Sequence, residues 1–118
     1  MEKRIKNIEH AVVLTLADQV TYQPGQIVSK TLAQTAHHNV TLFAFDKGEE
    51  ISAHDTAGDA LVTALDGVGS ITIGAEEYLL HAGQSIVMPA KVPHAVYAPE
   101  CFKMLLLVLF PDKEDTAS

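Results

Sequence analysis

The sequence predicts one all-β domain, a sandwich or a barrel, and three observations support this fold class. The chain has 118 residues, which is a usual size for a single domain. About ten short runs of strand-forming residues follow one another, with turn signals roughly every 8–12 residues. No apolar pattern of helical period is longer than one turn, so there is no room for the crossover helices of parallel βαβ units.

Turn-forming residues divide the first half of the chain. The segment Tyr22-Gln23-Pro24-Gly25 indicates a turn, because Pro24 followed by Gly25 suits the two central positions of type II. A polar loop at 34–39 carries His37-His38, and Asp46-Lys47-Gly48 forms the next turn. In order, we expect coil or a loose turn at 1–10, a strand at 11–16, one helical turn at 16–20, and extended segments at 26–32, 40–45 and 51–54.

Glycine and proline also limit the strands of the second half. Asp66-Gly67 ends one strand, and Gly74-Ala75 fits a two-residue hairpin of type II′, which places Gly first. Ala82-Gly83 turns the chain again, and Pro89 ends the next strand. We expect strands at 60–65, 70–73, 77–81, 85–88, 94–97 and 102–110. The resulting domain, 1–118, has a barrel over about 25–110, an N-terminal strand or arm over 1–24, and a frayed tail over 111–118.

The last predicted strand is apolar on both faces. Alternation gives one face Lys103, Leu105, Leu107 and Leu109, and the other face Met104, Leu106, Val108 and Phe110. Each leucine left in water would forgo roughly 1.5–3 kcal/mol of burial. We therefore expect the barrel interior to cover one face, and another sheet or another subunit to cover the second. The expected assembly is a homodimer.

Composition limits the classes of partner. The chain has 8 Lys and Arg against 15 Asp and Glu, a formal net charge of −7. This balance disfavours nucleic acids and anionic membranes as partners, and no apolar run reaches the ~18 residues of a membrane span. The N-terminal sequence MEKRIKNIEH lacks the apolar stretch of a signal peptide, and the single cysteine, Cys101, excludes an internal disulfide framework. We expect a cytoplasmic protein without nucleic-acid or membrane partners.

Two histidine motifs on this all-β background resemble those of the cupin superfamily. In the family's first motif, Gly and His are separated by five residues and a second Gly closes the motif; here Gly48, His54 and Gly67 fall in that register. The residues that match the second motif are Gly83, Pro89 and His94. The resemblance implies a small, single-domain, RmlC-like cupin, whose fold is a double-stranded β-helix or jelly-roll barrel.

The resemblance also implies where a metal would bind. The family uses two His and a Glu from the first motif and a His from the second. Carried over by position, His54 and His94 occupy two of these places, whereas Thr56 and Ala60 stand at the other two. A hydroxyl is a weak ligand and a methyl group is none, so the metal motif of this chain is degenerate.

A third ligand would have to come from elsewhere in the chain. Asp59 adjoins the vacant Glu position, and a bulge would turn it inward; His37 or His38 would have to reach over from its loop. A catalytic zinc or iron site uses about three protein ligands. Two alternatives therefore stay open: a bound divalent ion (zinc, iron, nickel or manganese), or no metal and two histidines that act as hydrogen-bonding pocket residues.

The second motif departs from the family at two further positions. Lys91 stands where the family has Gly, and Ala98 stands where it has Asn. If the glycine position requires a positive φ, a lysine there costs on the order of 1 kcal/mol. We therefore expect the loop around Lys91 to adopt a different conformation.

The expected site is an apolar pocket in the barrel with two imidazoles. Its predicted members are His54, His94, Thr56, Ala60, Phe43, Phe45, Met88 and Met104. Such a pocket suits a planar, weakly polar or carboxylate-bearing small molecule. Three functions remain open: a small-molecule-binding monocupin, a cupin enzyme of the isomerase, lyase or dioxygenase type, and a non-catalytic barrel that serves oligomerisation.

Overall fold

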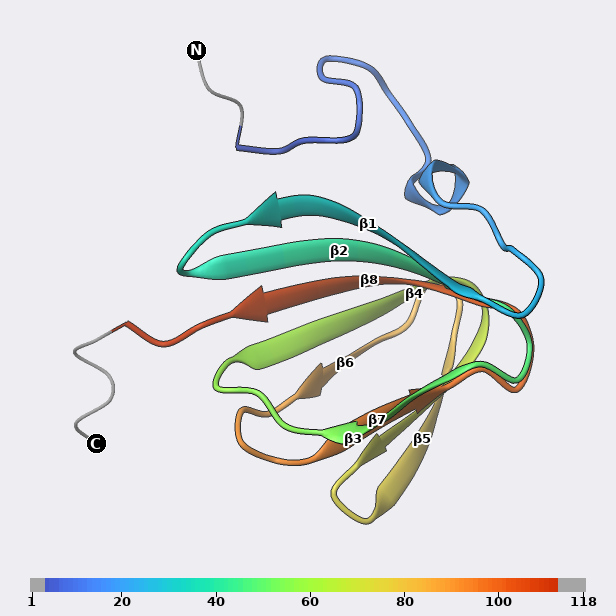
Figure 1. The fold of residues 1–118 in the computed structure, drawn as a ribbon, viewed down its shortest axis with the longest axis vertical. Helices are drawn as coiled ribbons and strands as arrows, with labels where there is room; N and C mark the ends of the chain where they lie inside the picture. Colours follow the sequence, from blue (N-terminus) through green and yellow to red (C-terminus); the bar gives the residue numbers. More distant parts are fainter. Residues whose placement is uncertain (1–3, 113–118) are drawn as a thin grey trace.

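The structure, a computed structural model, describes residues 4–112 and consists almost entirely of strands (Figure 1). Its elements are η1 (Leu16–Gln19), β1 (Ile27–Gln34), β2 (His38–Phe45), β3 (Glu50–His54), β4 (Asp59–Ile73), β5 (Glu76–His81), β6 (Ser85–Met88), β7 (His94–Tyr97) and β8 (Phe102–Leu109). Within these residues, eight strands replace the roughly ten that the turn signals predicted. In this described part, no helix is long and apolar enough to cross a membrane. Most of the tail expected to fray, from residue 113 on, lies outside the described residues.

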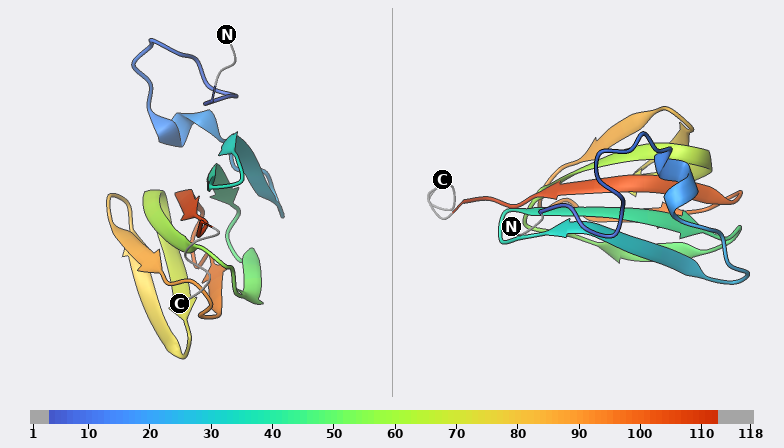
Figure 2. Two further views of the ribbon diagram at one scale, coloured as in Figure 1. Left: turned by 90° about the vertical axis from the view of Figure 1, so that its left-hand side faces the viewer. Right: turned by 90° about the horizontal axis from the view of Figure 1, so that it is seen from above.

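The strands form one antiparallel sheet that curls into a jelly-roll barrel (Figures 1 and 2). Their order is β1-β2-β8-β4-β7-β3, and β5 and β6 also pair with β4. The first part of β4 lies between β8 and β6, and its last part pairs with β5 and β7. The predicted all-β barrel is confirmed.

A bend in β4 joins the two sides of the barrel. The register of β4 against β8 shifts near this bend. Gly67 has φ +74 there, and a Cβ at this residue would lie 1.7 Å from the carbonyl oxygen of Cys101. Glycine allows the strand to bend because it lacks that atom. The separate strands predicted at 60–65 and 70–73 are therefore wrong as two elements: they are one bent strand.

One apolar core fills the barrel. Its buried side chains are Phe45, Ala60, Val62, Ala64, Ile71, Leu80, Met88, Val96, Ala98, Phe102, Met104 and Val108. They come from strands whose side chains point alternately inward and outward. Phe45 packs against Phe102 with ring centroids 5.8 Å apart. The predicted wall residues Phe45, Met88 and Met104 all belong to this core.

An N-terminal arm packs on the outer face of β1, β2 and β8 (Figure 2). The second apolar cluster between arm and sheet contains Val20, Leu32, Leu42 and Ala44, with Ile8, Leu16, Tyr22, Val28, Val40, Leu65 and Leu105 at its edge. The hydroxyl of Tyr22 donates to the carboxylate of Asp66 at 2.5 Å. The ammonium of Lys103 donates to the carbonyl of Ala17 at 2.6 Å and lies 4.8 Å from the centroid of the Tyr22 ring. These contacts fix the arm to the barrel.

The arm differs from its prediction in one element and matches it in two. The strand expected at 11–16 is wrong: the chain bends there, and Ala11 has φ +58, which is incompatible with a strand. The predicted helical turn is present as η1. The type II turn is also present, because the N–H of Gln26 donates to the carbonyl of Gln23 at 3.1 Å and Gly25 has φ +67.

The outer face of β8 has two parts. Leu105 packs against the arm, so its cover comes from the chain itself and not from the second sheet or subunit that the sequence suggested. Lys103 lies on this face, as expected from alternation, and holds the arm. Beyond the arm, Leu107 and Leu109 border an open groove, and Leu109 is exposed.

Candidate functional site

Two histidines face each other where β3 pairs with β7. This antiparallel pairing sets His54 directly opposite His94, after a shift of register between Ile51 and His54. On the other edge of β7, Ile73 of β4 lies opposite His94. The ring centroids of the two histidines are 4.5 Å apart, and the ring planes make an angle of 66°. The structure thus brings together the two side chains that the motifs indicated.

Both rings use the same nitrogen for a backbone contact. Nδ1 of His54 lies 3.0 Å from the carbonyl oxygen of Ser52, and Nδ1 of His94 lies 3.3 Å from that of Val92. A carbonyl oxygen only accepts hydrogen bonds, so Nδ1 carries the proton in each neutral ring. The lone pair is then on Nε2. The site therefore presents two acceptor nitrogens on neighbouring rings.

The two rings differ in burial. His94 is 4% exposed, whereas His54 is exposed. Burial lowers the pKa of His94 below 6.5, and His54 lowers it further, while the hydrogen bond to Val92 and the charge of Asp55 oppose this shift. His94 is therefore neutral at pH 7 and keeps its lone pair there.

The loop that leads into β7 is held against the loop that leads into β4. The N–H of Lys91 donates to the carbonyl of Thr56 at 2.8 Å. The N–H of Ala90 donates to Oδ1 of Asp59, also at 2.8 Å. Because β7 begins with His94, these two contacts help to set the position of that ring relative to β3.

Lys91 has a left-handed backbone, with φ +66. It is the third residue of a turn in which the N–H of Val92 donates to the carbonyl of Pro89 at 3.4 Å. A glycine suits this position, and an L side chain costs roughly 1 kcal/mol there. The expectation that the loop changes its conformation to avoid a positive φ is wrong: the lysine adopts it, and the contact with Thr56 holds it in place.

The other two carried-over positions have structural contacts. The hydroxyl of Thr56 donates to the carbonyl of Gly58 at 2.9 Å, within its own loop. Ala60 is 2% exposed and lies in β4 between Met88 and Val108. The methyl group of Ala60 fills core volume and supplies no donor atom to a ligand.

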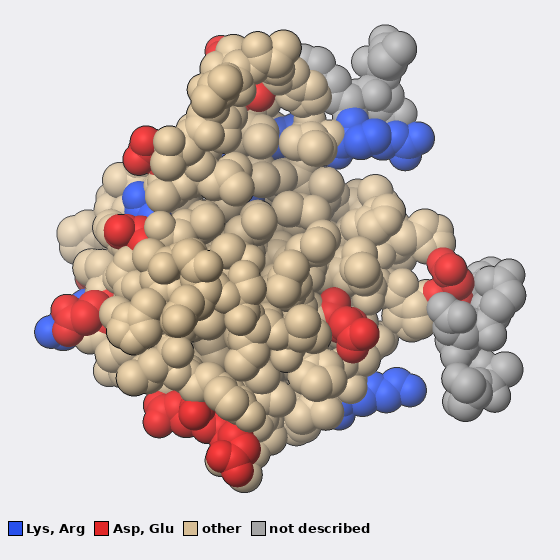
Figure 3. All heavy atoms as spheres, turned by 180° about the vertical axis from the view of Figure 1, so that it is seen from behind, with Lys and Arg blue, Asp and Glu red and all other residues tan. Residues whose placement is uncertain are grey.

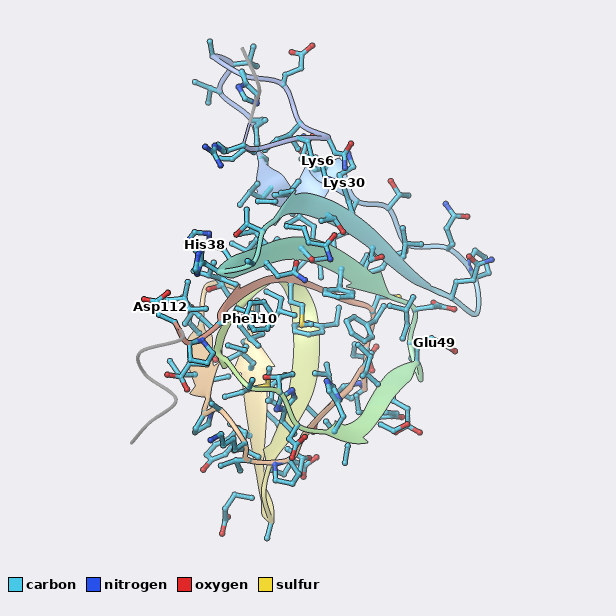
Figure 4. The ribbon with its side chains drawn as sticks, turned by 60° about the vertical axis from the view of Figure 1, so that its left-hand side comes forward. Lys6, Lys30, His38, Glu49, Phe110 and Asp112 are labelled. Atoms are coloured by element: carbon cyan, nitrogen blue, oxygen red, sulfur yellow. The ribbon has the colours of Figure 1, made fainter. Side chains whose placement is uncertain are left out.

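Among the described residues, the structure groups none of the proposed third ligands, Asp59, His37 and His38, with the histidine pair. Asp59 accepts the hydrogen bond from Ala90. His38 places Nδ1 3.1 Å from the hydroxyl oxygen of Thr35, and it lies with Phe110 near the ends of β2 and β8 (Figure 4). Within residues 4–112, no three or more His, Cys, Asp and Glu side chains come together in a way that could hold a metal ion.

The predicted walls lie in the barrel core, with one at its edge. Phe45, Met88 and Met104 are buried, and Phe43 is half-buried, 6.0 Å from Phe45 between ring centroids. Sequence reasoning missed Ile73, which pairs with His94. The strand order that places β4 beside β7 would have revealed it, but residue spacing carries no such information.

Comparison with known families agrees with this geometry. The cupin domain family matches residues 41–110. The matched range includes both histidines, the strands from β3 to β8 and the greater part of β2. Among curated proteins, none matches the chain.

Solved structures with the same fold cover nearly the whole chain. A conserved protein of unknown function from Streptococcus pyogenes is 49% identical, with a TM-score of 0.92, over 94% of this chain and 97% of that one. A cupin superfamily protein from Desulfitobacterium hafniense is 31% identical, with a TM-score of 0.88, over 92% and 100% of the two chains. An RmlC-like cupin from Desulfovibrio desulfuricans, 22% identical over 85% and 97% of the two chains, shares the fold with a TM-score of 0.72.

Proposed function

We propose that this chain, which belongs to the cupin superfamily, binds a small molecule at the barrel through His54 and His94. The observation that carries the proposal is the shared arrangement of the two rings. Each ring gives its Nδ1 proton to a backbone carbonyl, and the two Nε2 acceptors belong to rings 4.5 Å apart. A few polar groups beside apolar walls are the usual composition of a small-ligand site.

The protonation of the pair favours one class of ligand. Nε2 of neutral His94 accepts a hydrogen bond, so the ligand must bring a donor, such as a hydroxyl or an N–H group. A carboxylate brings only acceptors and would face a lone pair. Of the ligands that the sequence left open, a planar, weakly polar molecule with a hydroxyl group fits better than a carboxylate.

A metal-dependent enzyme is the second candidate, and one observation favours it. Metal-binding histidines commonly donate their second ring N–H to a carbonyl, as both rings do here. The donor set nevertheless does not fit a resident zinc, iron, nickel or manganese ion. It has two ring nitrogens where about three protein ligands are usual, and the described residues offer no cluster of three. The proposal therefore assigns no isomerase, lyase or dioxygenase step to a metal.

Charge and surface support a small molecule over a polyanion as the partner. The chain carries a net charge of −7. In the view from behind, basic side chains lie singly near the margin, and the centre of that face has no basic patch (Figure 3). We accordingly propose that the protein is cytoplasmic and has no nucleic-acid or membrane partners. Fractionation of cells would test this location.

A matched set of probes tests the proposal. Phenol, benzoate and toluene share a planar apolar ring and differ in the group that it carries. Each is titrated into untagged protein while long-range proton–nitrogen NMR follows the imidazole nitrogens. We expect phenol to shift Nε2 of His54 and His94, with weaker effects from benzoate and toluene. The His54→Ala, His94→Ala double variant should lose the response, and the control His81→Ala, at an exposed histidine of β5, should keep it.

The same protein separates the two candidates. Elemental analysis of untagged protein, with and without added zinc, nickel, manganese or ferrous iron, measures bound metal. Stoichiometric metal that the double variant loses would favour the enzyme. An equal phenol response in the wild type and the double variant would contradict the proposed site.

A further inference from the structure

A glutamate ends a row of side chains that begins with the histidine pair. Strand pairing sets His54 opposite His94 and His94 opposite Ile73. The partner of Ile73 on its other side is Glu76 of β5. Directly paired residues share one face of a sheet, so this row crosses β3, β7, β4 and β5 on one face, in the lower part of the barrel in Figure 1. Strands are spaced about 4.8 Å apart, so Glu76, two strands away, lies on the order of 10 Å from His94.

This face is the inner face of the barrel, and it opens to solvent along β5. Alternation places Leu80, Tyr78 and Glu76 on the same face as Ile71 and Ile73, their neighbours in β4. Ile71 and Leu80 belong to the apolar core and are 0% and 4% exposed. Tyr78 is 43% exposed, and Glu76 is exposed. Exposure therefore rises along the inner face toward Glu76, which lies at the opening of the barrel.

His94 reaches the same space with one ring nitrogen. Its Nδ1 contacts the carbonyl of Val92, and its Nε2 has no hydrogen-bond partner among the described residues. In this part of the chain, every fully buried side-chain nitrogen or oxygen has such a partner. Nε2 must therefore be accessible, although the residue as a whole is 4% exposed. The carboxylate of Glu76 likewise has no hydrogen-bond or ion-pair partner within residues 4–112. Both ends of the row are open to a ligand.

The chemistry of the row favours a cation over an anion. The Nε2 atoms of the neutral histidines and the carboxylate of Glu76 all accept hydrogen bonds. At the other end of the row, Asp55 follows His54, and its negative charge acts on His94. A positively charged donor binds a carboxylate more strongly than a neutral donor does. Between the polar ends, Ile73 packs against the core and offers an apolar floor.

We propose that Glu76 is a specificity-determining residue of the ligand site and selects a cationic ligand. This ligand has a hydroxyl group at one end, a planar apolar body, and a protonated amine at the other end. The hydroxyl group donates to the histidine pair, the body lies over Ile73, and the amine binds the carboxylate of Glu76. The ring of Tyr78, on the same face, favours a cation near it. The inference rests on the proposed function, because the hydroxyl end uses the same two histidines.

Three phenols that differ only in the end of the tail test this selection. Tyramine is 4-ethylphenol with an ammonium group on the terminal carbon, and 3-(4-hydroxyphenyl)propanoate carries a carboxylate there. A primary amine titrates near pH 10, so tyramine is a cation at pH 7.5. NMR titration of the untagged protein gives the dissociation constant of each probe. We expect tyramine to bind about fivefold more tightly than 4-ethylphenol, as an ion pair with an exposed carboxylate allows, and the propanoate to bind most weakly. Added salt should reduce the preference for tyramine.

Two variants with the same net charge separate a local contact from the field of the whole protein. E76Q should lower the affinity ratio of tyramine to 4-ethylphenol to about one. E77Q is the control, because Glu77 is the next residue of β5, points to the other face and accepts a hydrogen bond from Ser70. Glutamine keeps an acceptor for that bond, so E77Q should keep the ratio. Thermal melting checks that both variants are folded.

The outcomes distinguish this inference from the proposed function. Equal binding of tyramine and 4-ethylphenol to the wild type, tightest binding of the propanoate, or the same loss of preference in E76Q and E77Q would each overturn the role of Glu76. In these cases a response of His54 and His94 to 4-ethylphenol would still support the ligand site. If none of the three phenols shifts the imidazole nitrogens of the pair, both the inference and the proposed function fail.

Discussion

His54 and His94 lie opposite each other on β3 and β7, with ring centroids 4.5 Å apart, and each turns Nδ1 toward the carbonyl of the residue two positions before it. The pair therefore has a defined tautomer set by the backbone, not by a bound ligand. Four features of the surrounding structure give predictions that do not require the ligand to be known.

The charge state of His94 makes stability depend on pH. Its pKa in the folded state is below 6.5 because the ring is buried. The unfolded chain therefore takes up the proton first as pH falls, so the contribution of this residue is complete above about pH 6.5 and declines below that. Urea unfolding of wild type and His94→Asn from pH 8 to pH 5 should show a stability difference that shrinks as pH falls. A constant or growing difference would contradict the assignment.

Lys91 tests the strain in the loop before β7. At φ +66, a Cβ is unfavourable whatever the rest of the side chain does. Lys91→Gly should be more stable than Lys91→Ala by about 1 kcal/mol in urea unfolding, because the alanine keeps the Cβ. Equal stability of the two variants would show that the positive φ is not strained here.

Gly67 and Gly83 separate the effect of φ from that of space. Both have positive φ. A Cβ at Gly67 would lie 1.7 Å from the carbonyl oxygen of Cys101, whereas a Cβ at Gly83 would have no other atom within 4 Å. Gly83→Ala should cost about 1 kcal/mol. Gly67→Ala should cost about 2–4 kcal/mol, since the backbone must also move. If chemical denaturation gives the same cost for both, the bend in β4 is not as close to Cys101 as described.

Tyr22 tests how the arm is fixed. Burial raises the pKa of Tyr22 well above 10, and its hydrogen bond to Asp66 raises it further. Alkaline titration followed by ultraviolet absorbance should show one late tyrosine step, which Tyr22→Phe should remove. The variant should also lose about 0.5–1.5 kcal/mol of unfolding free energy, the usual net contribution of a hydrogen bond, because solvent reaches Asp66. If Tyr22→Phe instead removes a tyrosine step at ordinary pH and the late step remains, the contact with Asp66 is refuted.

The sequence could predict the strands wherever glycine or proline marks their ends. The limits expected for 85–88 and 94–97 coincide with β6 and β7, because Gly83, Pro89 and Pro93 leave few alternatives. The bend at Gly67 carries the same local sequence signal as a strand end. The sequence therefore predicts two strands where the structure has one, β4. The arm could not be predicted as a cover, since packing between segments distant in sequence leaves no local pattern.

The site could be predicted in part. The two histidine motifs indicated His54 and His94, but only the register of β3 against β7 shows that they are directly opposite. The roles of Ser52 and Val92 depend on their backbone carbonyls, which any residue type supplies. Lys91 shows a different limit of sequence-based prediction. A lysine disfavours positive φ, but the residue adopts it here, and the hydrogen bond with Thr56 holds it in place.

The most direct test of the account is the tautomer of the two rings in the protein without ligand. Nitrogen-15 NMR of histidine-labelled protein at pH 7.5 distinguishes a protonated from an unprotonated ring nitrogen. We predict a proton on Nδ1 and a lone pair on Nε2 in both His54 and His94. A proton on Nε2 of either ring would contradict it, because the acceptor pair on which the proposed ligand site depends would then not exist.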